Sequence, residues 1–574
     1  MTFLRFYKSF IKIFSISQKR EIFLLFFLSI FAMIFETLSI ASIFPFLDYI
    51  FEGSKTLKDY YFLNDILRPS SENYLIFLII FFISIFFIKA LYLSFFTYKK
   101  NKFIYDIRTF QTNNLFESYV HENYLFHINT NSANLIRNLN DANLLSVFAR
   151  SLVDLFTEIV MFFGILIFLL ILSPEITIGL TVFFGFLGLI FYKLVQTKAS
   201  IWGEQSKIYR GLKLKNQKES FGAIRDIKIL GKEKNFINIF SSNNFMENEY
   251  TKKHSFVLSL PKIWFEWLAV IAMVTLIMYL TQNLLDKSKI IPILGIFALA
   301  AYRLIPSISK ISNYLQDMKF CLPAVEPFME NQKYLERFDE IKSLEKPKKI
   351  NFKDKISVNN LSFKFPGTSE FILENLDFQI KKGECIGIYG RSGEGKTTLI
   401  NLLLGLLVPN QGLITVDNKN INSTLKDWQK IISYIPQNVF ITDDKIVNNI
   451  ALGENDNKID YNKIKESVKI SNIEEFISDL PKGLNTKCGE LGERFSGGQK
   501  QRLGIARAFY IDAEILIFDE FTNFLDANNE QKIINEVSML KGKKTIVMIS
   551  HKISTLSKCD KIFKLEKKKL TISQ

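Results

Sequence analysis

Cysteine is scarce in this sequence, and the few cysteines form no recognisable pattern. The chain has 574 residues and four cysteines, Cys321, Cys385, Cys488 and Cys559. No two of them form a Cys-x-x-Cys pair, so the sequence indicates neither a zinc site nor a structural disulfide. The N-terminus also lacks a small-residue cleavage site after a short apolar core, so we expect no removable signal peptide.

Patterns that bind nucleic acid are lacking as well, although the net charge is +15. In a soluble protein such a charge would suggest nucleic acid as a partner. The basic residues form no stripe interleaved with aromatic side chains, and no known nucleic-acid motif occurs. We therefore expect no nucleic-acid partner.

Long apolar runs, in contrast, dominate the first half of the chain, which also holds most of the 56 phenylalanines. An apolar run of about 18 or more residues is long enough to cross a bilayer. The sequence therefore predicts a multi-pass membrane protein rather than a large soluble enzyme. The six predicted spans are residues 21–50, 73–98, 143–172, 176–194, 256–282 and 288–308.

The distribution of Lys and Arg predicts how these spans are oriented. Basic residues gather in residues 1–20, 97–140 and 193–253, as expected for cytoplasmic segments. An even number of spans then leaves the N- and C-termini in the cytoplasm. The linking stretches 99–142 and 195–255 are polar and contain few Pro or Gly residues. We expect them to be helices that continue out of the membrane, each with a short reversal at its tip.

The pattern changes in the last part of the chain. From Ile356 onwards, short apolar runs typical of β-strands alternate with helical stretches. This alternation predicts an α/β domain with a largely parallel sheet. The predicted organisation is an all-α transmembrane domain of six helices over residues 1–320, a connector over residues 321–350 and a nucleotide-binding α/β domain over residues 351–574.

A phosphate-binding loop occupies the start of this α/β domain. The run from Gly390 to Thr397 reads Gly-Arg-Ser-Gly-Glu-Gly-Lys-Thr, follows an apolar strand and precedes a helical run. Glycines let backbone N–H groups approach the phosphates, which also meet the positive end of the helix. We expect Lys396 to bind the β- and γ-phosphates of ATP, and Thr397 to bind Mg²⁺. The predicted ATP-binding residues here are Gly390, Ser392, Gly393, Gly395, Lys396, Thr397 and Thr398.

Two carboxylates follow a second apolar strand. Residues 515–518 read Ile-Leu-Ile-Phe, and Asp519 and Glu520 come next. We expect Asp519 to hold Mg²⁺, in part through water. Glu520 is placed to polarise the attacking water as a general base would. Paired acids after a strand are weak evidence alone, and become strong evidence downstream of a phosphate loop.

Further motifs resemble those of ABC exporters. Phe495-Ser-Gly-Gly-Gln499 resembles the ABC signature, which usually begins with Leu, and this resemblance assigns Ser496, Gly497, Gly498 and Gln499 to ATP binding. The resemblance covers the whole chain and implies a half-transporter of the type IV fold. In this family the signature of one domain closes over ATP held by another. Since one loop and one signature occur here, it implies a homodimer, with a heterodimer as the alternative.

Single residues at matching positions extend the resemblance to ABC exporters. Gln437 is similar to the glutamine of the Q-loop, which contributes to catalysis and Mg²⁺ binding. His551 is similar to the switch histidine, and the resemblance implies a catalytic role for it. Phe365 stands where the family stacks an aromatic ring on adenine. Glu490 lies in a segment similar to the exporter X-loop. The D-loop ends at Asp526, which the resemblance also assigns to ATP binding. The middle residues of this loop differ from the family pattern.

Charged residues within the predicted spans are costly and therefore suggest function. One interpretation is local pairing at i,i+4, of Lys262 with Glu266 and of Arg150 with Asp154. That interpretation leaves two basic residues of other spans without a local partner. The other interpretation is that basic residues of three spans line a cavity for an anionic group such as pyrophosphate. These predicted cavity residues are Lys89, Lys262 and Arg303.

The membrane half resembles one subfamily in particular. Residues 35–45, 260–266 and 302–307 are similar to segments of PglK-type flippases. That resemblance implies ATP-driven flipping of a polyprenyl-pyrophosphate-linked oligosaccharide across the bacterial inner membrane, for protein glycosylation. Its partners would be membrane lipid and the lipid-linked saccharide. Export of peptides, drugs or other lipids is the alternative, and a nucleotide-gated protein that does not pump is a further one.

Overall fold

The computed structural model describes residues 14–42, 74–172, 174–283, 290–344, 352–523 and 527–573. The chain divides into two compact units. The first comprises residues 1–122 and 126–342, and the second comprises residues 123–125 and 343–574. The first unit is helical, whereas the second combines two β-sheets with helices. This confirms the predicted fold class, a helical membrane domain followed by an α/β nucleotide-binding domain.

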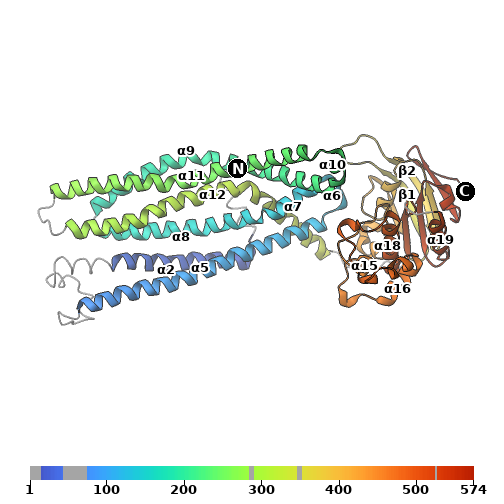
Figure 1. The fold of residues 1–574 in the computed structure, drawn as a ribbon, viewed down its shortest axis with the longest axis horizontal. Helices are drawn as coiled ribbons and strands as arrows, with labels where there is room; N and C mark the ends of the chain where they lie inside the picture. Colours follow the sequence, from blue (N-terminus) through green and yellow to red (C-terminus); the bar gives the residue numbers. More distant parts are fainter. Residues whose placement is uncertain are drawn as a thin grey trace. The chain divides into compact units, whose positions relative to one another are not determined.

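Long helices build the first unit, and its short helices lie where the long ones reverse direction (Figure 1). As predicted, the stretches 99–142 and 195–255 are helical, with reversals near residues 122–131 and 223–232. Gly231 ends the short helix of residues 224–230, which forms the second reversal. Its φ of 60° is a left-handed conformation that favours glycine. The helices are α2 (Ile16–Ala41), α5 (Tyr74–His121), α6 (Tyr124–Asn129), α7 (Ser132–Asn140), α8 (Ala142–Leu172), α9 (Pro174–Gly222), α10 (Ile224–Leu230), α11 (Glu233–Asn283) and α12 (Ile290–Leu344).

The ends and surfaces of these helices follow from the sequence. Ser15 caps α2, because its hydroxyl accepts a hydrogen bond from Gln18 N at 3.3 Å and the Gln18 side chain accepts one from Ser15 N at 3.1 Å. On α5 the side chains of Ile80, Ile83 and Phe87 are 56%, 60% and 63% exposed. Such an outward apolar stripe is unfavourable in water and suits lipid.

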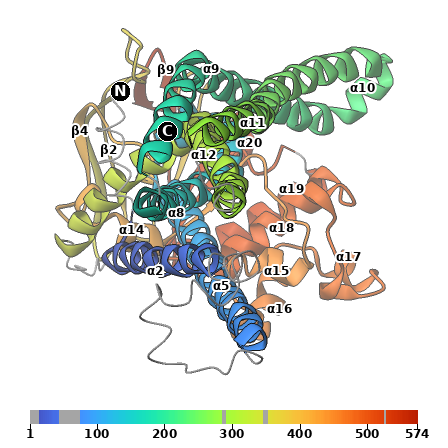
Figure 2. The same ribbon diagram turned by 90° about the vertical axis from the view of Figure 1, so that its left-hand side faces the viewer.

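By length and apolar composition, four helices of the described chain qualify as membrane spans. They are Ile16–Ala41, Ile79–His121, Ser132–Ile171 and Glu233–Tyr279. The fourth predicted span lies within α9, and residues 290–308 of the sixth lie within α12, whereas residues 288–289 are outside the described residues. Many side chains of both spans are also outside the described set. Within this unit α9 runs along α11, and α2 packs on α5 and α8 (Figures 1 and 2).

Two sheets form the second unit. The first has the order β2-β1-β4-β5 and is antiparallel. The second has the order β10-β9-β3-β8-β7-β6 and is parallel except for the β9–β10 hairpin. The strands are β1 (Lys355–Phe363), β2 (Leu373–Lys381), β3 (Cys385–Tyr389), β4 (Gln411–Val416), β5 (Lys419–Asn420), β6 (Ile432–Ile435), β7 (Ile515–Asp519), β8 (Thr545–Ser550), β9 (Lys561–Glu566) and β10 (Lys569–Ile572).

Apolar side chains join these layers into a core. One buried cluster places residues of both sheets against α13 (Lys396–Leu403), including Ile386, Leu399 and Val547. A separate cluster, which includes Phe495, joins α15 (Ile446–Ile450), α16 (Tyr461–Ile470) and α18 (Gly497–Tyr510), the helices labelled in Figure 1. The unit therefore has a sheet part and a helical part, and a further cluster packs Ile505 and Ala508 of α18 against the parallel sheet.

Candidate ATP site

The phosphate loop joins β3 to α13. β3 is a buried central strand that ends at Tyr389, and α13 begins at Lys396, so the loop lies where parallel strands end. Gly395 has φ 98°, which an ordinary side chain rarely adopts. A Cβ atom on Gly390 would lie 2.5 Å from the backbone oxygen of Leu565, so only glycine fits there.

The Lys396 side chain folds back over this loop. Its ammonium group donates hydrogen bonds to the backbone oxygens of Gly390 and Arg391 at 2.9 and 3.0 Å. It also lies 3.7 Å from Glu520 Oε1. Burial lowers the pKa of Lys396 from its ordinary value. A cation held at this position is suited to bind phosphate oxygens that enter the loop.

Glu520 is the centre of a cluster drawn from three parts of the chain. Its Oε1 lies 2.5 Å from His551 Nε2, after β8. Its Oε2 accepts hydrogen bonds from Gln437 Nε2 at 2.7 Å and from Asn523 Nδ2 at 3.0 Å. Glu520 itself has φ 46°, an unusual conformation for a residue other than glycine. The structure thus brings together the predicted catalytic residues Glu520, His551 and Gln437.

Asp519 lies at the end of β7, beside this cluster. Tyr434 donates a hydrogen bond from its hydroxyl to Asp519 Oδ2 at 3.2 Å. Burial raises the pKa of Asp519 to about 6, with a contribution from the charge of Glu520. Tyr434 was not among the predicted site residues. The sequence signal that could have pointed to it is its place three residues before Gln437. The structure adds that it lies at the end of β6, which pairs with β7.

The donor set around Asp519 fits Mg²⁺ held together with a nucleotide. No group of three His, Cys, Asp or Glu side chains able to hold a metal occurs among the described residues. Mg²⁺ usually needs only one or two carboxylates, because phosphates and water fill its other positions. Asp519, the exposed Thr397 in the first turn of α13 and the amide oxygen of Gln437 can supply such ligands.

The signature residues form the start of α18, within the helical part of the unit. Ser496 caps this helix, and the side chains and backbone of Ser496 and Gln499 form a reciprocal capping box. Gly497 and Gly498 occupy the first turn. The signature motif's Phe495 belongs to the helical cluster, whereas the phosphate loop's helix belongs to the sheet cluster. Residues next to the two motifs therefore pack into different clusters, although Ile505 and Ala508, further along α18, pack against the parallel sheet.

The unusual D-loop residues have structural roles. Phe521 is buried, and its ring centre lies 4.7 Å from that of Phe518. Asn523 contacts Glu520 as described above. Phe524 and Asp526 lie outside the described residues. Phe365, expected to stack on adenine, is half-buried with its ring centre 5.1 Å from that of Phe363.

Comparison with known proteins agrees with both units. A family model for the ABC transporter transmembrane region matches residues 21–302, and a model for the ABC transporter itself matches residues 373–523. The chain belongs to the ABC transporter family. Its order, a membrane region followed by an ATP-binding domain, is that of an exporter.

Relatives and a solved structure extend this assignment. A probable ABC transporter ATP-binding/permease protein of Haemophilus influenzae is 38% identical over 231 residues, which cover 40% of this chain and 41% of the relative. An ATP-dependent lipid A-core flippase of Vibrio parahaemolyticus is 38% identical over 211 residues, which cover 37% of this chain and 36% of the relative. The chain thus spans about two-fifths of the length of such curated relatives.

A bacterial Atm1-family ABC exporter, solved with ATP bound, shares the fold of this transporter. Its TM-score is 0.76 at 20% sequence identity, and the match covers 95% of this chain and 93% of that chain.

The charged residues of the transporter's membrane unit pair mainly between helices. Asp154 pairs with Lys100 of α5 at 2.6 Å rather than with Arg150, so that predicted i,i+4 pair is wrong. Lys89 is not left without a partner either, because its ammonium lies 3.1 Å from Glu36 and 3.0 Å from the Ser39 hydroxyl, both on α2.

Glu158 and Lys262 also have ion-pair partners. Glu158, on α8, contacts Lys310 and Ser307 of α12 at 2.7 and 2.5 Å. Lys262 pairs with Glu266 at 3.9 Å, as the spacing predicts, and both side chains are largely exposed. The side chain of Arg303 lies outside the described set.

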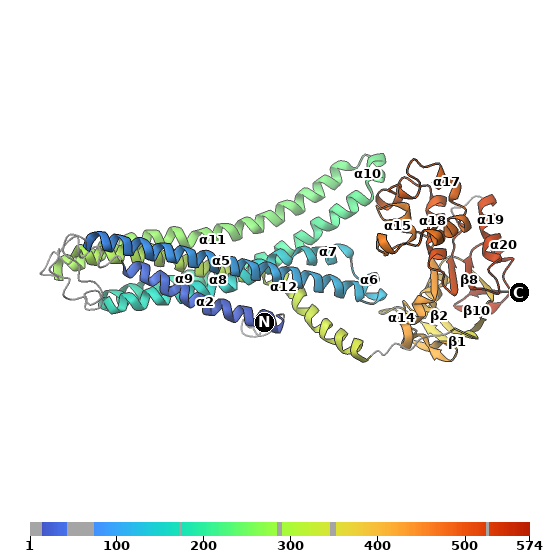
Figure 3. The same cartoon turned by 90° about the horizontal axis from the view of Figure 1, so that it is seen from below.

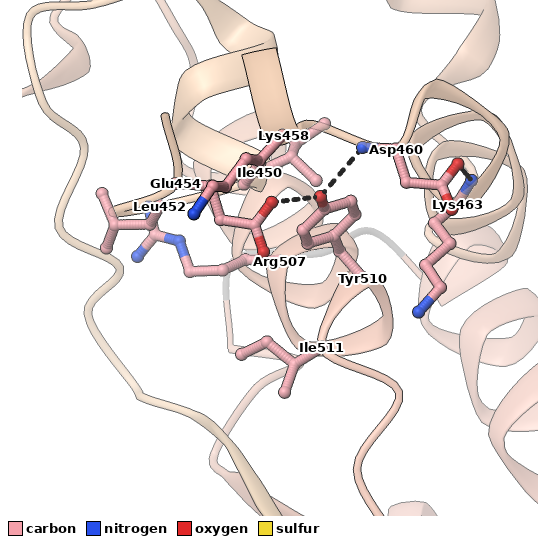
Figure 4. A pocket seen from close by; sticks show the side chains of 10 residues that line it. Ile450, Leu452, Glu454, Lys458, Asp460, Lys463, Arg507, Tyr510 and Ile511 are labelled. Atoms are coloured by element: carbon pink, nitrogen blue, oxygen red, sulfur yellow. Dashed lines mark hydrogen bonds between the residues drawn. The ribbon is translucent and has the colours of Figure 1, made fainter. Parts of the chain in front are cut away.

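A separate cavity of about 420 Å³ lies in the helical part of the ATP-binding domain (Figure 4). The Tyr510 hydroxyl bridges two of its walls, donating to Glu454 Oε2 at 2.7 Å and accepting from Asp460 N at 3.2 Å. Arg507 is held by the backbone oxygens of Asn449 and Phe440 at 2.9 and 3.0 Å. No predicted ATP-site residue lines this cavity.

Proposed function

We propose that this protein is an ATP-hydrolysing exporter that moves a lipid-linked cargo across a membrane. The observation that carries the proposal is the cluster around Glu520. A carboxylate that lies 2.5 Å from His551 and 2.7 Å from Gln437, with Lys396 3.7 Å away, has the arrangement needed to orient a water molecule beside a phosphate.

Each residue of this cluster has a distinct task in the proposed reaction. Lys396 binds the β- and γ-phosphates, and Mg²⁺, when bound, neutralises their developing charge. Glu520 accepts a hydrogen bond from the attacking water and draws its proton. Gln437 and His551 hold the Glu520 carboxylate in place, and His551 also lies 3.2 Å from the Gly390 oxygen, beside the phosphate loop. Phe365 contributes an aromatic face for adenine.

A second copy of the chain would complete the ATP site. Phe495, next to the signature residues at the start of α18, packs in a different cluster from the helix that follows the phosphate loop. In the homodimer that we propose, Ser496, Gly497, Gly498 and Gln499 of one copy meet ATP held by the other. The D-loop, which ends at Asp526, would cross between the copies.

The proposed cargo is a lipid with an anionic head, specifically a polyprenyl-pyrophosphate-linked oligosaccharide. The names of the flippase relatives support a lipid. Of the three proposed cavity cations, Lys262 is best suited to bind the anion, since its side chain is 72% exposed and its ion pair at 3.9 Å is long. Lys89 is 17% exposed and held by Glu36, so its first role is structural. Arg303 stays a proposed ligand.

The proposed location is the bacterial inner membrane, with both termini in the cytoplasm. The basic segments 97–140 and 193–253 support this orientation, because positively charged segments favour the cytoplasmic side. ATP would then reach the second unit directly.

The proposal is tested with the purified protein in liposomes. ATP hydrolysis and movement of a polyprenyl-pyrophosphate oligosaccharide are measured together for the unmodified protein, Glu520→Gln and Lys262→Ala. We expect ATP-dependent movement that is lost in Glu520→Gln and weakened in Lys262→Ala. Undiminished hydrolysis by Glu520→Gln would refute the assigned role of that residue.

A matched control separates cargo binding from loss of an ion pair. Lys215 pairs with Glu219 at 3.7 Å, also at i,i+4, and both side chains are about half exposed. Lys215→Ala should leave lipid movement unchanged. Equal losses in Lys262→Ala and Lys215→Ala would contradict an anion-binding role for Lys262. Hydrolysis without lipid movement would instead redirect the cargo assignment to peptides or drugs.

A further inference from the structure

Two cysteines lie against each other beneath the phosphate loop. Cys385 begins β3, the strand that leads to the loop, and Cys559 precedes β9. The Cys385 thiol donates a hydrogen bond to Cys559 Sγ across 3.4 Å. Both are free thiols. The sulfur–sulfur bond of a disulfide is about 2.05 Å long, so a small shift of the two side chains would bring the sulfurs to bonding distance.

The backbone around the two cysteines is already fixed. Asp560, the neighbour of Cys559, accepts a hydrogen bond from Cys385 N at 2.8 Å through its carboxylate. Its own N–H donates to the Cys385 oxygen at 2.7 Å. Lys541 holds the other carboxylate oxygen at 2.8 Å. The two chain segments therefore stay in register while the sulfurs move.

The sequence also leaves room for the Cys559 side chain. A Cβ atom on Gly387, in the middle of β3, would lie 3.2 Å from Cys559 Sγ. The sulfur thus packs over the glycine of the strand that carries the phosphate loop. Cys385 is buried, whereas Cys559 is partly exposed, so a small oxidant reaches Cys559 first.

We propose that Cys385 and Cys559 form a pair that hydrogen peroxide oxidises to a disulfide, and that this disulfide slows ATP turnover. The slowing rests on the proposed ATP hydrolysis, whereas disulfide formation does not.

Formation of the disulfide consumes two thiols and one molecule of hydrogen peroxide. The Cys559 thiolate attacks peroxide, which yields a sulfenic acid and hydroxide. Cys385 then attacks the sulfenic sulfur and releases hydroxide, so the net products are one disulfide and two water molecules. The hydrogen bond to Cys559, together with burial, raises the pKa of Cys385, which makes the second step slow.

The link to turnover runs through His551. This residue precedes α20 (Ile553–Leu556), which lies beside β8 (Figure 3). The same helix also packs against β3, and Cys559 follows it in the chain. His551 contacts Glu520 and lies near the Gly390 oxygen. A disulfide ties the far end of this segment to the base of β3. Hydrogen bonds between Asp560 and Cys385 already hold this end in place, and the disulfide makes the attachment covalent. The slowing that we propose is the effect of this tighter attachment on the contact of His551 with Glu520.

The test uses the full-length protein with Cys321→Ser and Cys488→Ser, which leaves two thiols per chain. After peroxide treatment and quenching, thiols are counted in denaturant and the linked peptides are identified by mass spectrometry. We expect the thiol count to fall from two to near zero within one chain and to return with a dithiol reductant. Two remaining thiols, a disulfide between chains, or sulfinic acid at Cys559 would overturn the proposal.

The effect on turnover is measured with the same protein. ATP hydrolysis should fall several-fold on oxidation and recover on reduction, and a protein that also carries Cys559→Ser should not respond to peroxide. A disulfide that forms without slowing hydrolysis would refute the regulatory part. If the reduced protein does not hydrolyse ATP at all, the proposed function fails, while the thiol count still decides whether the pair closes.

Discussion

Asp519 provides the most direct test of the electrostatics of the ATP site. Burial raises the pKa of this carboxyl to about 6, well above its ordinary value. A protonated Asp519 is a poor ligand for Mg²⁺, so Mg²⁺-dependent binding of ATP should weaken as the pH falls through 6. With a pKa of about 6, the ionised fraction falls from roughly nine-tenths at pH 7 to one-tenth at pH 5, a loss of about tenfold.

Two substitutions should move this midpoint in opposite directions. The Tyr434 hydroxyl donates to Asp519 and favours the charged form, so Tyr434→Phe should shift the midpoint to higher pH. The charge of Glu520 disfavours ionisation of Asp519, so Glu520→Gln should shift the midpoint to lower pH. Opposite shifts cannot result from a general loss of stability.

The assay is binding of a fluorescent ATP analogue between pH 5 and 8, with Mg²⁺ and with EDTA. Asp519→Asn is the control, because it keeps the titration of the nucleotide phosphates and removes that of the carboxyl. We expect a Mg²⁺-dependent midpoint near pH 6 that is absent from Asp519→Asn. Shifts in the same direction for Tyr434→Phe and Glu520→Gln would refute this account of the site.

Two further predictions concern the loop and the membrane unit. Gly390→Ala should abolish ATP binding and lower the unfolding temperature, because its Cβ would lie 2.5 Å from the Leu565 oxygen, and normal binding by this variant would contradict the geometry. Lys89→Met should destabilise the solubilised protein by about 3–5 kcal/mol, since it removes the ammonium group that lies 3.1 Å from the buried Glu36 carboxylate. The double variant with Glu36→Gln should recover most of this loss in a thermal unfolding assay, and a fully stable single variant would argue against the pair.

The fold and the centre of the ATP site were predictable because local sequence carries them. A phosphate loop must follow a strand and precede a helix, which fixes where Lys396 lies. Carboxylates at the end of a parallel strand fall at the same edge of the sheet, which brings Glu520 to the loop. Tyr434 and Asn523 were missed as contacts of these carboxylates, because tyrosine and asparagine in such positions have many ordinary roles.

The charged residues of the membrane unit show where sequence spacing stops being informative. The spacing of Arg150 and Asp154 predicts a pair along one helix, but Asp154 pairs with Lys100, a residue 54 positions away. An i,i+4 pair contributes only about 0.2–0.5 kcal/mol, so it does not hold Asp154 to Arg150 when an ammonium group of another helix lies 2.6 Å away. Which helices are neighbours is a tertiary property that spacing does not encode. Lys262 has its local partner Glu266 at 3.9 Å, and both side chains are largely exposed.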